Sequence, residues 1–414
     1  MKSKRGIRRS VERKLDVASL LKLIPSNLLE QLADELDVDF QVKHLFGALM
    51  FQLFLYTIIK SERISTHILE HYYNSKSFSL FANKGEHQTL FTSISDRLKV
   101  IKCEFFEKIF IEVRKELEKH FIHKSKQVLE ILRFDSTMVA VGAGLVDFGM
   151  DVGTKAKTGN GKKQIKYTIG LKGILPSDIE LYTEKEDLCE DNALGKSILK
   201  SKSTQEAIVT FDRGLKKRKT FCEIDDQIQF VTRLKIPLRY LVISTHKQIK
   251  GRESETLIFE KDVIVKLYGD GHKLYEKEFR LIIATRKKDG VQIAFLTNNR
   301  ELNMVEISNI YKRRWDIEVF FRFLKQEINL KELASLSING IKVMMYMILI
   351  AAMLILIYKK VNKIPGFKIA KVSFEEDLSF EITKNFALIC GADPKKVKDY
   401  SSNLYKISKN YCVD

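Results

Sequence analysis

Residues 311–325 read YKRRWDIEVFFRFLK, and this stretch decides what is expected of the rest of the chain. Four polar residues in it stand at offsets of 0, 3, 7 and 14: Tyr311, Arg314, Glu318 and Lys325. On a helix that turns by about 100° per residue, these side chains fall within roughly 60° of one another. One stripe then carries a phenol, a guanidinium, a carboxylate and an ammonium, a set suited to holding a metal ion beside a phosphodiester.

The adjoining face of the same stretch is apolar. Its members are Ile310, Ile317, Phe320, Phe321, Leu324 and Ile328. A helix of this kind docks on a core through one face while it presents charges on the other. We therefore predict one helix across the segment, which holds the charged stripe in a fixed position.

Two further acidic residues end short runs that are typical of β-strands. Asp135 closes VLEILRFD, and Asp212 follows AIVTF, where β-branched and aromatic residues are concentrated. Both are predicted to be strand ends that open onto a cleft. Mg²⁺ prefers oxygen ligands and is commonly held by one or two carboxylates together with substrate phosphates. The sequence therefore predicts that Asp135, Asp212 and Glu318 converge as catalytic residues and metal ligands for two Mg²⁺ ions, with Mn²⁺ able to substitute.

Other acidic and histidine residues compete with this interpretation. Asp147 and Asp151 are rivals for the first acid, but they lie in a glycine-rich stretch with no apolar strand before them. The run His67-Ile-Leu-Glu70-His71 has the H-x-x-E-H pattern of a zinc site. Such a site needs a third ligand and a cleft, so a solvated or interface histidine pair is the preferred interpretation. A single strand-end aspartate is also ordinarily a turn former or a helix cap.

Taken together, these motifs resemble those of a bacterial insertion-sequence transposase of the DDE type. Tyr311, Arg314, Glu318 and Lys325 match at every position the Tyr-x2-Arg-x3-Glu-x6-Lys signature of the insertion-sequence family usually numbered four, and Trp315 follows the arginine as in many members. FDST, FDRG and FLTN precede the signature in the expected order. The resemblance covers nearly the whole chain. It implies an α/β fold with a ribonuclease-H-like catalytic core, which is interrupted by a β-rich insertion and flanked by helical N-terminal and C-terminal regions.

By this resemblance the chain divides into five parts. They are a helical domain that binds DNA ends (1–125), the first part of the core (126–232), the β-rich insertion (233–304), the second part of the core with the signature helix (305–360) and a helical C-terminal region (361–414). The insertion is expected because 105 residues separate Asp212 from Glu318, too many for a simple connection. Its strands are predicted at 263–268, 278–285 and 291–297, with Asp289-Gly290 as the turn between the last two.

The resemblance implies a transposase that cleaves phosphodiesters at transposon ends and joins the freed 3′-OH to target DNA, in cut-and-paste transposition with two metal ions. DNA phosphates are expected to contact Tyr311, Arg314, Lys325, Arg213, Lys166, Arg322 and Trp315. Arg314 and Lys325 could also form a plain solvated face. A hairpin intermediate is put in doubt, because Ile293 stands where some relatives have a stacking tryptophan; Phe295 is the candidate substitute.

The charge of the chain agrees with a nucleic-acid partner. There are 71 basic against 53 acidic residues, a formal charge of +18, and the pI is about 9.4. Such a surface attracts phosphate backbones, although ribosomal and membrane-surface proteins share this property. The expected partners are double-stranded DNA, as terminal inverted repeats and target, and a second copy in a paired-end homodimer. Two alternatives stay open: a nuclease that cuts without joining, and a DNA-binding protein whose catalysis has lapsed.

The chain is expected to work in the cytoplasm, on the nucleoid. Its five cysteines are scattered without CxxC spacing, and no continuous apolar segment follows the basic N-terminus. The apolar run at 343–358 has roughly 16 residues, fewer than the ~20 that cross a bilayer. We therefore predict a buried core helix there and no membrane association.

Overall fold

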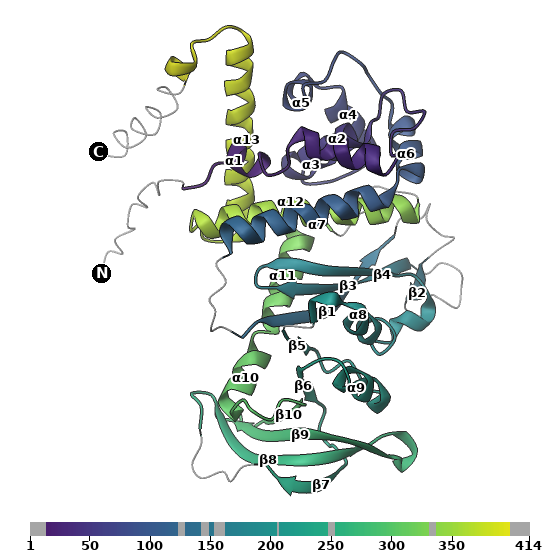
Figure 1. Ribbon diagram of the computed structural model, residues 1–414, viewed down its shortest axis with the longest axis vertical. Helices are drawn as coiled ribbons and strands as arrows, with labels where there is room; N and C mark the ends of the chain where they lie inside the picture. Colours follow the sequence, from purple (N-terminus) through teal and green to yellow (C-terminus); the bar gives the residue numbers. More distant parts are fainter. Residues whose placement is uncertain are drawn as a thin grey trace. The chain divides into compact units, whose positions relative to one another are not determined.

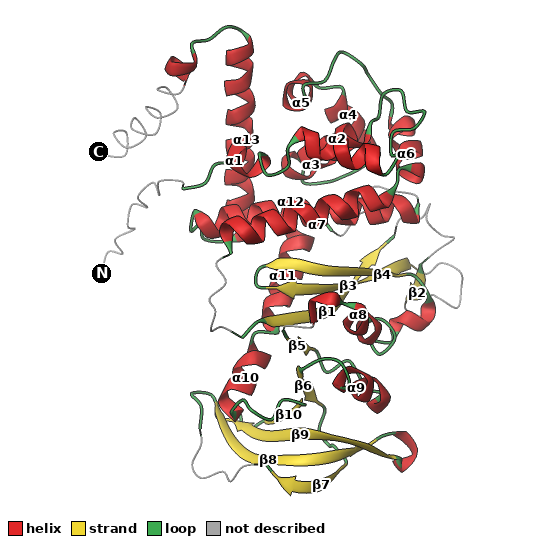
Figure 2. Cartoon of the chain, viewed as in Figure 1, coloured by secondary structure: helices red, strands yellow, loops and turns green. Residues whose placement is uncertain are grey.

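The computed structural model describes residues 14–122, 129–141, 149–152, 162–204, 207–246, 253–330 and 337–397 (Figure 1). The chain divides into two compact units, one formed by residues 1–123 with 326–414 and the other by residues 124–325. Within the described ranges, helices alone build the first unit and all strands belong to the second (Figure 2).

The helical unit is assembled around a long apolar helix, α12. Its helices are α1 (Val17–Leu21), α2 (Ser26–Glu35), α3 (Gly47–Lys60), α4 (Thr66–Tyr73), α5 (Lys76–Ala82), α6 (Phe91–Val100), α7 (Cys103–Phe121), α12 (Ile338–Val361) and α13 (Phe367–Ile389). α3, α6, α7 and α13 all pack against α12. A helix that is apolar on all sides must be covered on all sides, which is what these neighbours do.

By length and composition alone, α12 could cross a membrane. Its 24 residues extend the apolar run predicted at 343–358 in both directions, but 89% of its most apolar 18-residue window is buried inside the unit. The prediction of a buried core helix is therefore confirmed in this unit.

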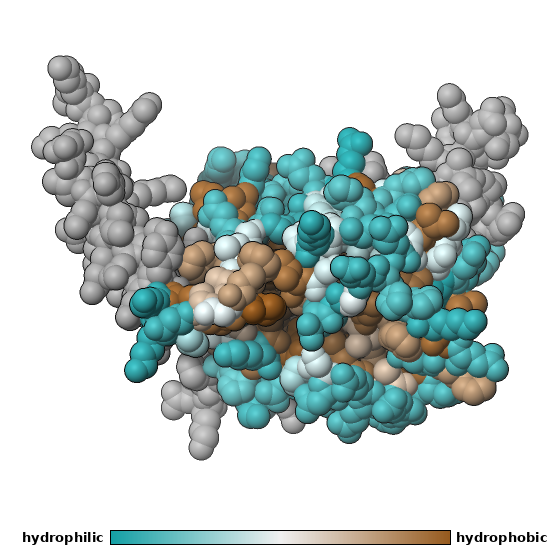
Figure 3. All heavy atoms as spheres, turned by 90° about the horizontal axis from the view of Figure 1, so that it is seen from above, coloured by the Kyte–Doolittle hydropathy of each residue, from teal (hydrophilic) through white to brown (hydrophobic). Residues whose placement is uncertain are grey.

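The surface of the helical unit is mixed. α13 buries one stripe, made of Ala370, Phe374, Leu378 and Ile382, and leaves other apolar side chains exposed, among them Phe386 and Ile389. Seen from above, the molecule shows a largely hydrophilic face that apolar side chains interrupt (Figure 3).

The second unit contains one large mixed sheet. Its strands are β1 (Ile131–Ala140), β2 (Met150–Val152), β3 (Lys162–Lys172), β4 (Leu175–Tyr182), β5 (Ile208–Phe211), β6 (Phe230–Leu234), β7 (Tyr240–Thr245), β8 (Leu257–Tyr268), β9 (Leu274–Arg286) and β10 (Gln292–Thr297). In the described residues their order is β2-β3-β1-β5-β6-β10-β9-β8-β7, with β4 also paired to β3. β1, β5 and β6 run parallel, and the other pairs are antiparallel.

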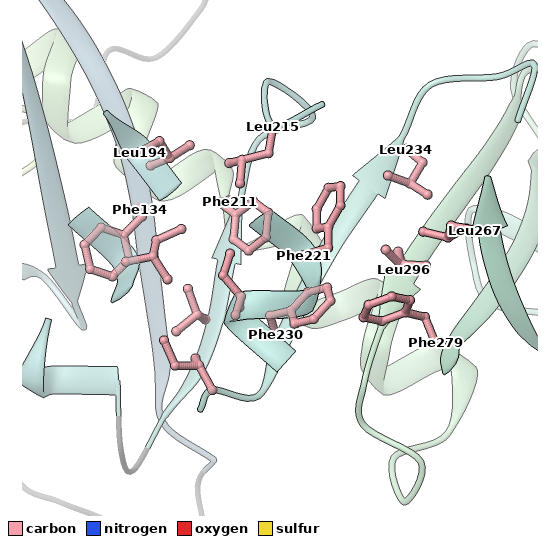
Figure 4. Close-up of a cluster of buried hydrophobic side chains, with 14 of the residues drawn as sticks. Phe134, Leu194, Phe211, Leu215, Phe221, Phe230, Leu234, Leu267, Phe279 and Leu296 are labelled. Atoms are coloured by element: carbon pink, nitrogen blue, oxygen red, sulfur yellow. The ribbon is translucent and has the colours of Figure 1, made fainter. Parts of the chain in front are cut away.

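Helices cover both faces of this sheet. They are α8 (Leu194–Lys200), α9 (Arg218–Asp225), α10 (Met304–Lys312) and α11 (Trp315–Gln326). On one face the rings of Phe211, Phe221 and Phe230 lie 5.8–6.3 Å apart, so α9 packs onto β5 and β6 (Figure 4). On the other face, α10 packs Met304 and Ile307 against the sheet. The alternation of side chains along the central strands thus supplies apolar residues to both faces.

Three predicted strands are confirmed, as parts of β8, β9 and β10. The turn predicted between the last two is also present: Gly290 has a φ of 68°, and Arg286 N donates to Val291 O. β7 was not predicted. These strands do not form a sheet of their own, because β10 pairs with β6 and so continues the sheet of the core. The mixed α/β fold agrees with expectation, and the ribonuclease-H-like identity and the five-part division stay predictions.

Candidate active site

Two of the three expected acids are brought together by the register of β1 and β5. Phe134 lies opposite Phe211 in this parallel pair, and Asp135 and Asp212 are the next residues along the chain. Neighbouring strands lie about 4.8 Å apart, so the two carboxylates come to the same level. They are close enough for the charge of Asp212 to raise the pKa of Asp135.

The prediction that Asp135 closes its strand is wrong. β1 continues to Ala140 because β3 pairs with it up to the register pair of Ala140 and Gln164. Asp212, in contrast, follows Phe211, the last residue of β5. The edge at which the acids meet is thus made by the end of β5 alone.

Of the two rival acids, only the backbone of Asp151 is described, and its strand is not adjacent to β1. Asp147 lies outside the described residues, and Asp151 is on β2, which β3 separates from β1. In the H-x-x-E-H run on α4, His67 Nδ1 lies 4.0 Å from Glu70 Oε2. Over the described ranges, no group of three histidine, cysteine or acidic side chains forms here.

The signature segment is two helices and not one. α10 ends at Lys312 and α11 begins at Trp315. At the junction, Arg314 N donates to Tyr311 O (2.9 Å) and Ile317 N to Arg314 O (3.2 Å), the i to i−3 pattern of a tightened turn. The prediction of one continuous helix is therefore wrong here. The apolar face is buried as expected, including Ile317, Phe320 and Leu324.

A buried arginine on β1 explains the break. Arg133 is 1% exposed; its Nε donates to Arg313 O (2.9 Å), and its guanidinium pairs with Asp316 at 3.2 Å. In a continuous helix, Arg313 O would accept a hydrogen bond from the N–H of Ile317. Here Arg313 O accepts instead from Arg133 Nε and from Asp316 N (3.1 Å), and Arg133 anchors the junction to the strand that carries Asp135.

Arg314 lies at the junction and contacts two of the acids. Its Nη1 lies 3.7 Å from Asp135 Oδ2, and its Nη2 donates to Glu318 Oε1. The residue is only 8% exposed, and its Nε finds no acceptor among the described residues. The guanidinium therefore links the first and third acids and still carries one unsatisfied donor.

The charges of the site are tightly coupled. Burial raises the pKa of Asp135 to about 7, and the charges of Asp212 and Glu190 raise it too, against the lowering effects of the Ser136 N–H and Arg314. Burial opposes the charge of Arg314, yet its hydrogen bond to Glu318 and the charges around it raise its pKa above the ordinary value. Like charges held together in a partly buried place oppose folding. Such arrangements are typical of functional sites, where they are retained for the chemistry.

This arrangement predicts that Asp135→Asn stabilises the sheet unit of the metal-free protein at neutral pH. The Asp135 pKa is about 7 in the folded protein and near 3.8 when unfolded. The protonated Asp135 side chain therefore makes its full contribution to stability below pH 4, and this contribution is lost as the pH rises through 7. We expect a gain on the order of 2–4 kcal/mol above pH 7 that vanishes near pH 4.

Urea unfolding in EDTA, followed by the fluorescence of the single tryptophan, Trp315, would measure this gain. Asp96→Asn, on an exposed face of α6, serves as the control and should change little at any pH. A gain that is equal at pH 4 and pH 8 would contradict the burial of a charged Asp135.

Tyr311 is enclosed by side chains from the sheet. Its ring lies 5.8 Å from that of Phe295, edge-on, and 5.6 Å from the guanidinium carbon of Arg233 on β6. Arg233 was missed from the sequence because a lone arginine in a short apolar strand carries no motif. Its Nε is also buried without an acceptor among the described residues. Phe295 is 3% exposed, so its ring is covered in the protein without DNA, and its part as a stacking residue stays a prediction.

The other residues expected at DNA have different surroundings. Arg213 and Arg322 are exposed, Trp315 is 54% exposed, and Lys325 is half-buried in the last turn of α11. Lys166 is 2% exposed, and its ammonium donates to Glu190 Oε1 (3.0 Å) and Leu188 O (2.8 Å). A phosphate contact by Lys166 stays a prediction. In this structure its ammonium already donates to Glu190 and Leu188 inside the protein.

The donor chemistry of the site fits a hard divalent cation, because its candidate ligands are carboxylate oxygens. Within the described residues, however, no three acidic, histidine or cysteine side chains gather closely enough to form a metal site by themselves. Arg314 contacts two of the candidate ligands, Asp135 and Glu318. A guanidinium is thus shared between these two carboxylates.

The family and the relatives that this chain matches are all named as transposases. Residues 128–354, more than half of the chain, match the family described as "Transposase DDE domain". A Sinorhizobium fredii protein named as transposase y4zB is 30% identical over 135 residues, 33% of this chain and 37% of that protein. A Synechocystis protein named as a transposase for insertion sequence element IS4SA is 26% identical over 258 residues, 60% and 66% of the two chains.

A third relative, from Geobacillus stearothermophilus, is named as a transposase for insertion sequence element IS5377. It is 25% identical over 259 residues, which are 60% of this chain and 64% of that protein. The aligned region thus spans less than two thirds of the length of each of these relatives.

Proposed function

The chain belongs to the transposase DDE domain family, and from this premise we propose that it is a DNA transposase, which cleaves the ends of an insertion sequence and joins them to target DNA. The observation that supports the proposal is that Arg314 contacts Asp135 and Glu318, while Asp212 follows the strand next to Asp135 and its charge acts on both Asp135 and Arg314. These residues come from a strand, a strand end and a helix, and each is held by a rigid element, as a catalytic constellation requires.

We assign the catalytic role to the three carboxylates. Mg²⁺ ions bound by Asp135, Asp212 and Glu318 would activate the attacking oxygen and stabilise the leaving 3′-oxygen, and Mn²⁺ would serve as well. The same carboxylates could serve in hydrolysis and in strand transfer, because only the attacking oxygen differs: water first, then the freed 3′-OH.

The arginines would bind the DNA phosphates. In the part of the chain that the structure describes, Arg314 and Arg233 each keep a buried Nε donor without an acceptor, and a phosphate oxygen between them would satisfy both. Both guanidinium groups lie near the ring of Tyr311, at 5.9 Å and 5.6 Å from its centroid. A phosphate that draws Arg314 toward itself would also loosen its hold on Asp135 and Glu318, so that DNA binding favours a competent carboxylate site.

Excision through a hairpin would need an accessible aromatic side chain. A hairpin needs a flipped base, which is stabilised by stacking on a ring. Ile293 has no ring and Phe295 is buried, whereas Trp315, next to Arg314, is half exposed. We propose that Trp315 is the stacking residue if excision passes through a hairpin. The partners would be terminal inverted repeats and target DNA, bound by a homodimer in the cytoplasm.

The proposal is tested by incubating the purified protein with the inverted repeats that flank its gene, target DNA and Mg²⁺. We expect end-specific cuts and joined products, both of which disappear with EDTA. Cuts without joining would indicate a nuclease, and bound but unbroken DNA a binding protein whose catalysis has lapsed. Either of these results would overturn the transposase assignment.

A further inference from the structure

Glu190 and Asp191, in the segment between β4 and α8, touch the surroundings of both acid-bearing strands. Glu190 Oε2 accepts a hydrogen bond from Ser136 Oγ at 2.8 Å, and its Oε1 accepts one from the buried Lys166 at 3.0 Å. Ser136 follows Asp135 on β1, and its N–H donates to Asp135 Oδ1 at 2.8 Å. Glu190 therefore anchors the residue that orients the first acid.

The same pair of residues holds the loop that follows the second acid. Asp191 is 7% exposed and accepts hydrogen bonds from Lys216 N (3.0 Å), Lys217 N (2.9 Å) and Thr220 Oγ1 (3.1 Å). Glu190 also lies directly against this loop, since a Cβ placed on Gly214 would be 2.9 Å from Glu190 Cγ. One dipeptide thus contacts β1 next to Asp135 and the loop next to Asp212.

The charge of Glu190 is not what a purely structural contact would need. Its negative charge acts on Asp135, as that of Asp212 does, and like charges in a partly buried place oppose folding. The pair with Lys166 buries an ammonium as well. Buried charges that lower stability in this way are retained where the geometry of a site depends on them.

We propose that Glu190 and Asp191 are positioning residues that set the placement of Asp135 relative to Asp212, and that Lys166 serves by holding Glu190 and not by binding DNA. This inference rests on the proposed function. It assigns to the segment before α8 a role in the reaction that neither the signature nor the acids themselves reveal.

The test compares Lys166→Met, Glu190→Gln and the double variant, which removes both charges together. The single variants leave one partner unpaired and are expected to melt earlier than the wild type. The double variant is expected to melt near the wild-type temperature, while its kcat for end cleavage stays about 10- to 100-fold lower with an unchanged KM. Recovery of kcat together with the melting temperature would show a structural role only and overturn the proposal.

DNA binding without metal supplies a second readout for Lys166. For Lys166→Met we expect the slope of log affinity against log salt to match the wild type. Arg233→Met, at a proposed phosphate contact, should reduce the slope by about one. A reduced slope in Lys166→Met would mean that its ammonium binds DNA, contrary to the proposal.

Gly214→Ala keeps the test decisive if the charge variants fold poorly. The added Cβ forces the Glu190 side chain to shift while every charge is retained. We expect a similar loss of kcat, and an unchanged kcat would contradict the proposed positioning.

The matched control is Glu180→Gln, in the exposed pair with Lys200 at 3.6 Å, which should change nothing. A wild-type protein that does not cut DNA would refute the proposed function; normal cutting by the variants would refute only this inference.

Discussion

Asp135→Asn, Asp212→Asn and Glu318→Gln are each expected to lower the rate of DNA-end cleavage by more than about a thousandfold. Each substitution keeps the size of the side chain and removes one anionic ligand. A hard divalent cation is held by such charges, so loss of any one weakens the stabilisation of the leaving oxygen. The measurement is the appearance of nicked end DNA in single-turnover reactions with Mg²⁺.

Binding of end DNA separates catalysis from folding in this experiment. All three variants should bind the ends within about tenfold of the wild type, because phosphate contacts come mainly from basic groups. Glu223→Gln, on the exposed side of α9 in an i,i+4 pair with Lys219, is the control and should cleave normally. Cleavage within tenfold of the wild type by any acid variant would exclude that residue from the catalytic set.

Arg280→Met is expected to lower the free energy of unfolding of the sheet unit by about 3–5 kcal/mol. Arg280 and Asp262 are fully buried between β9 and β8, with two hydrogen bonds of 2.8 Å between them. Arg280 also donates to Leu302 O at 2.6 Å. Without the guanidinium, the buried Asp262 carboxylate keeps only the His246 ring at 3.4 Å, and the carbonyl before α10 loses a donor.

The fluorescence of Trp315 during urea unfolding measures this effect, because the tryptophan lies in the same unit. Arg286→Met, on the same strand, is a close control. Its partner Asp289 is also an aspartate, but the two side chains are 43% and 40% exposed, so little change in the free energy of unfolding is expected. The double variant Arg280→Met with Asp262→Leu should recover most of the loss. Equal effects at Arg280 and Arg286 would show that burial does not control the energy of the pair.

Arg280 also connects stability to function. Leu302 and Asn303 lead into α10, where the Asn303 side chain accepts from Glu306 N in a capping box. α10 carries Tyr311 toward Arg233 and Phe295. The strands β8 and β9, which belong to the predicted insertion, thus hold the start of the signature helices in place.

Local patterns identified much of the candidate site. Short runs of β-branched and other apolar residues located parts of β8, β9 and β10, and helical periodicity located the buried face of α11. The identities of Asp135, Asp212 and Glu318 were predicted from motif order. These features depend on neighbouring residues, so they leave a trace in a short window of sequence.

Other features depend on contacts between distant parts of the chain. Arg133 donates to a carbonyl 180 residues away, and that bond divides the signature into two helices. Lys166 was expected at DNA because it is basic, yet Glu190, 24 residues later, binds it inside the protein. Neither partner can be recognised from the residues that flank it.

Side-chain type and spacing along the chain are enough to show which groups are available for chemistry and which helix face and strands are apolar. How the side chains meet depends on folding: the register of β1 and β5 places Asp135 beside Asp212, and Arg314 joins Asp135 to Glu318. The reason is physical. Register, burial and ion pairing come from packing between segments far apart in the chain, and the energy of each contact depends on the partner that folding brings to it.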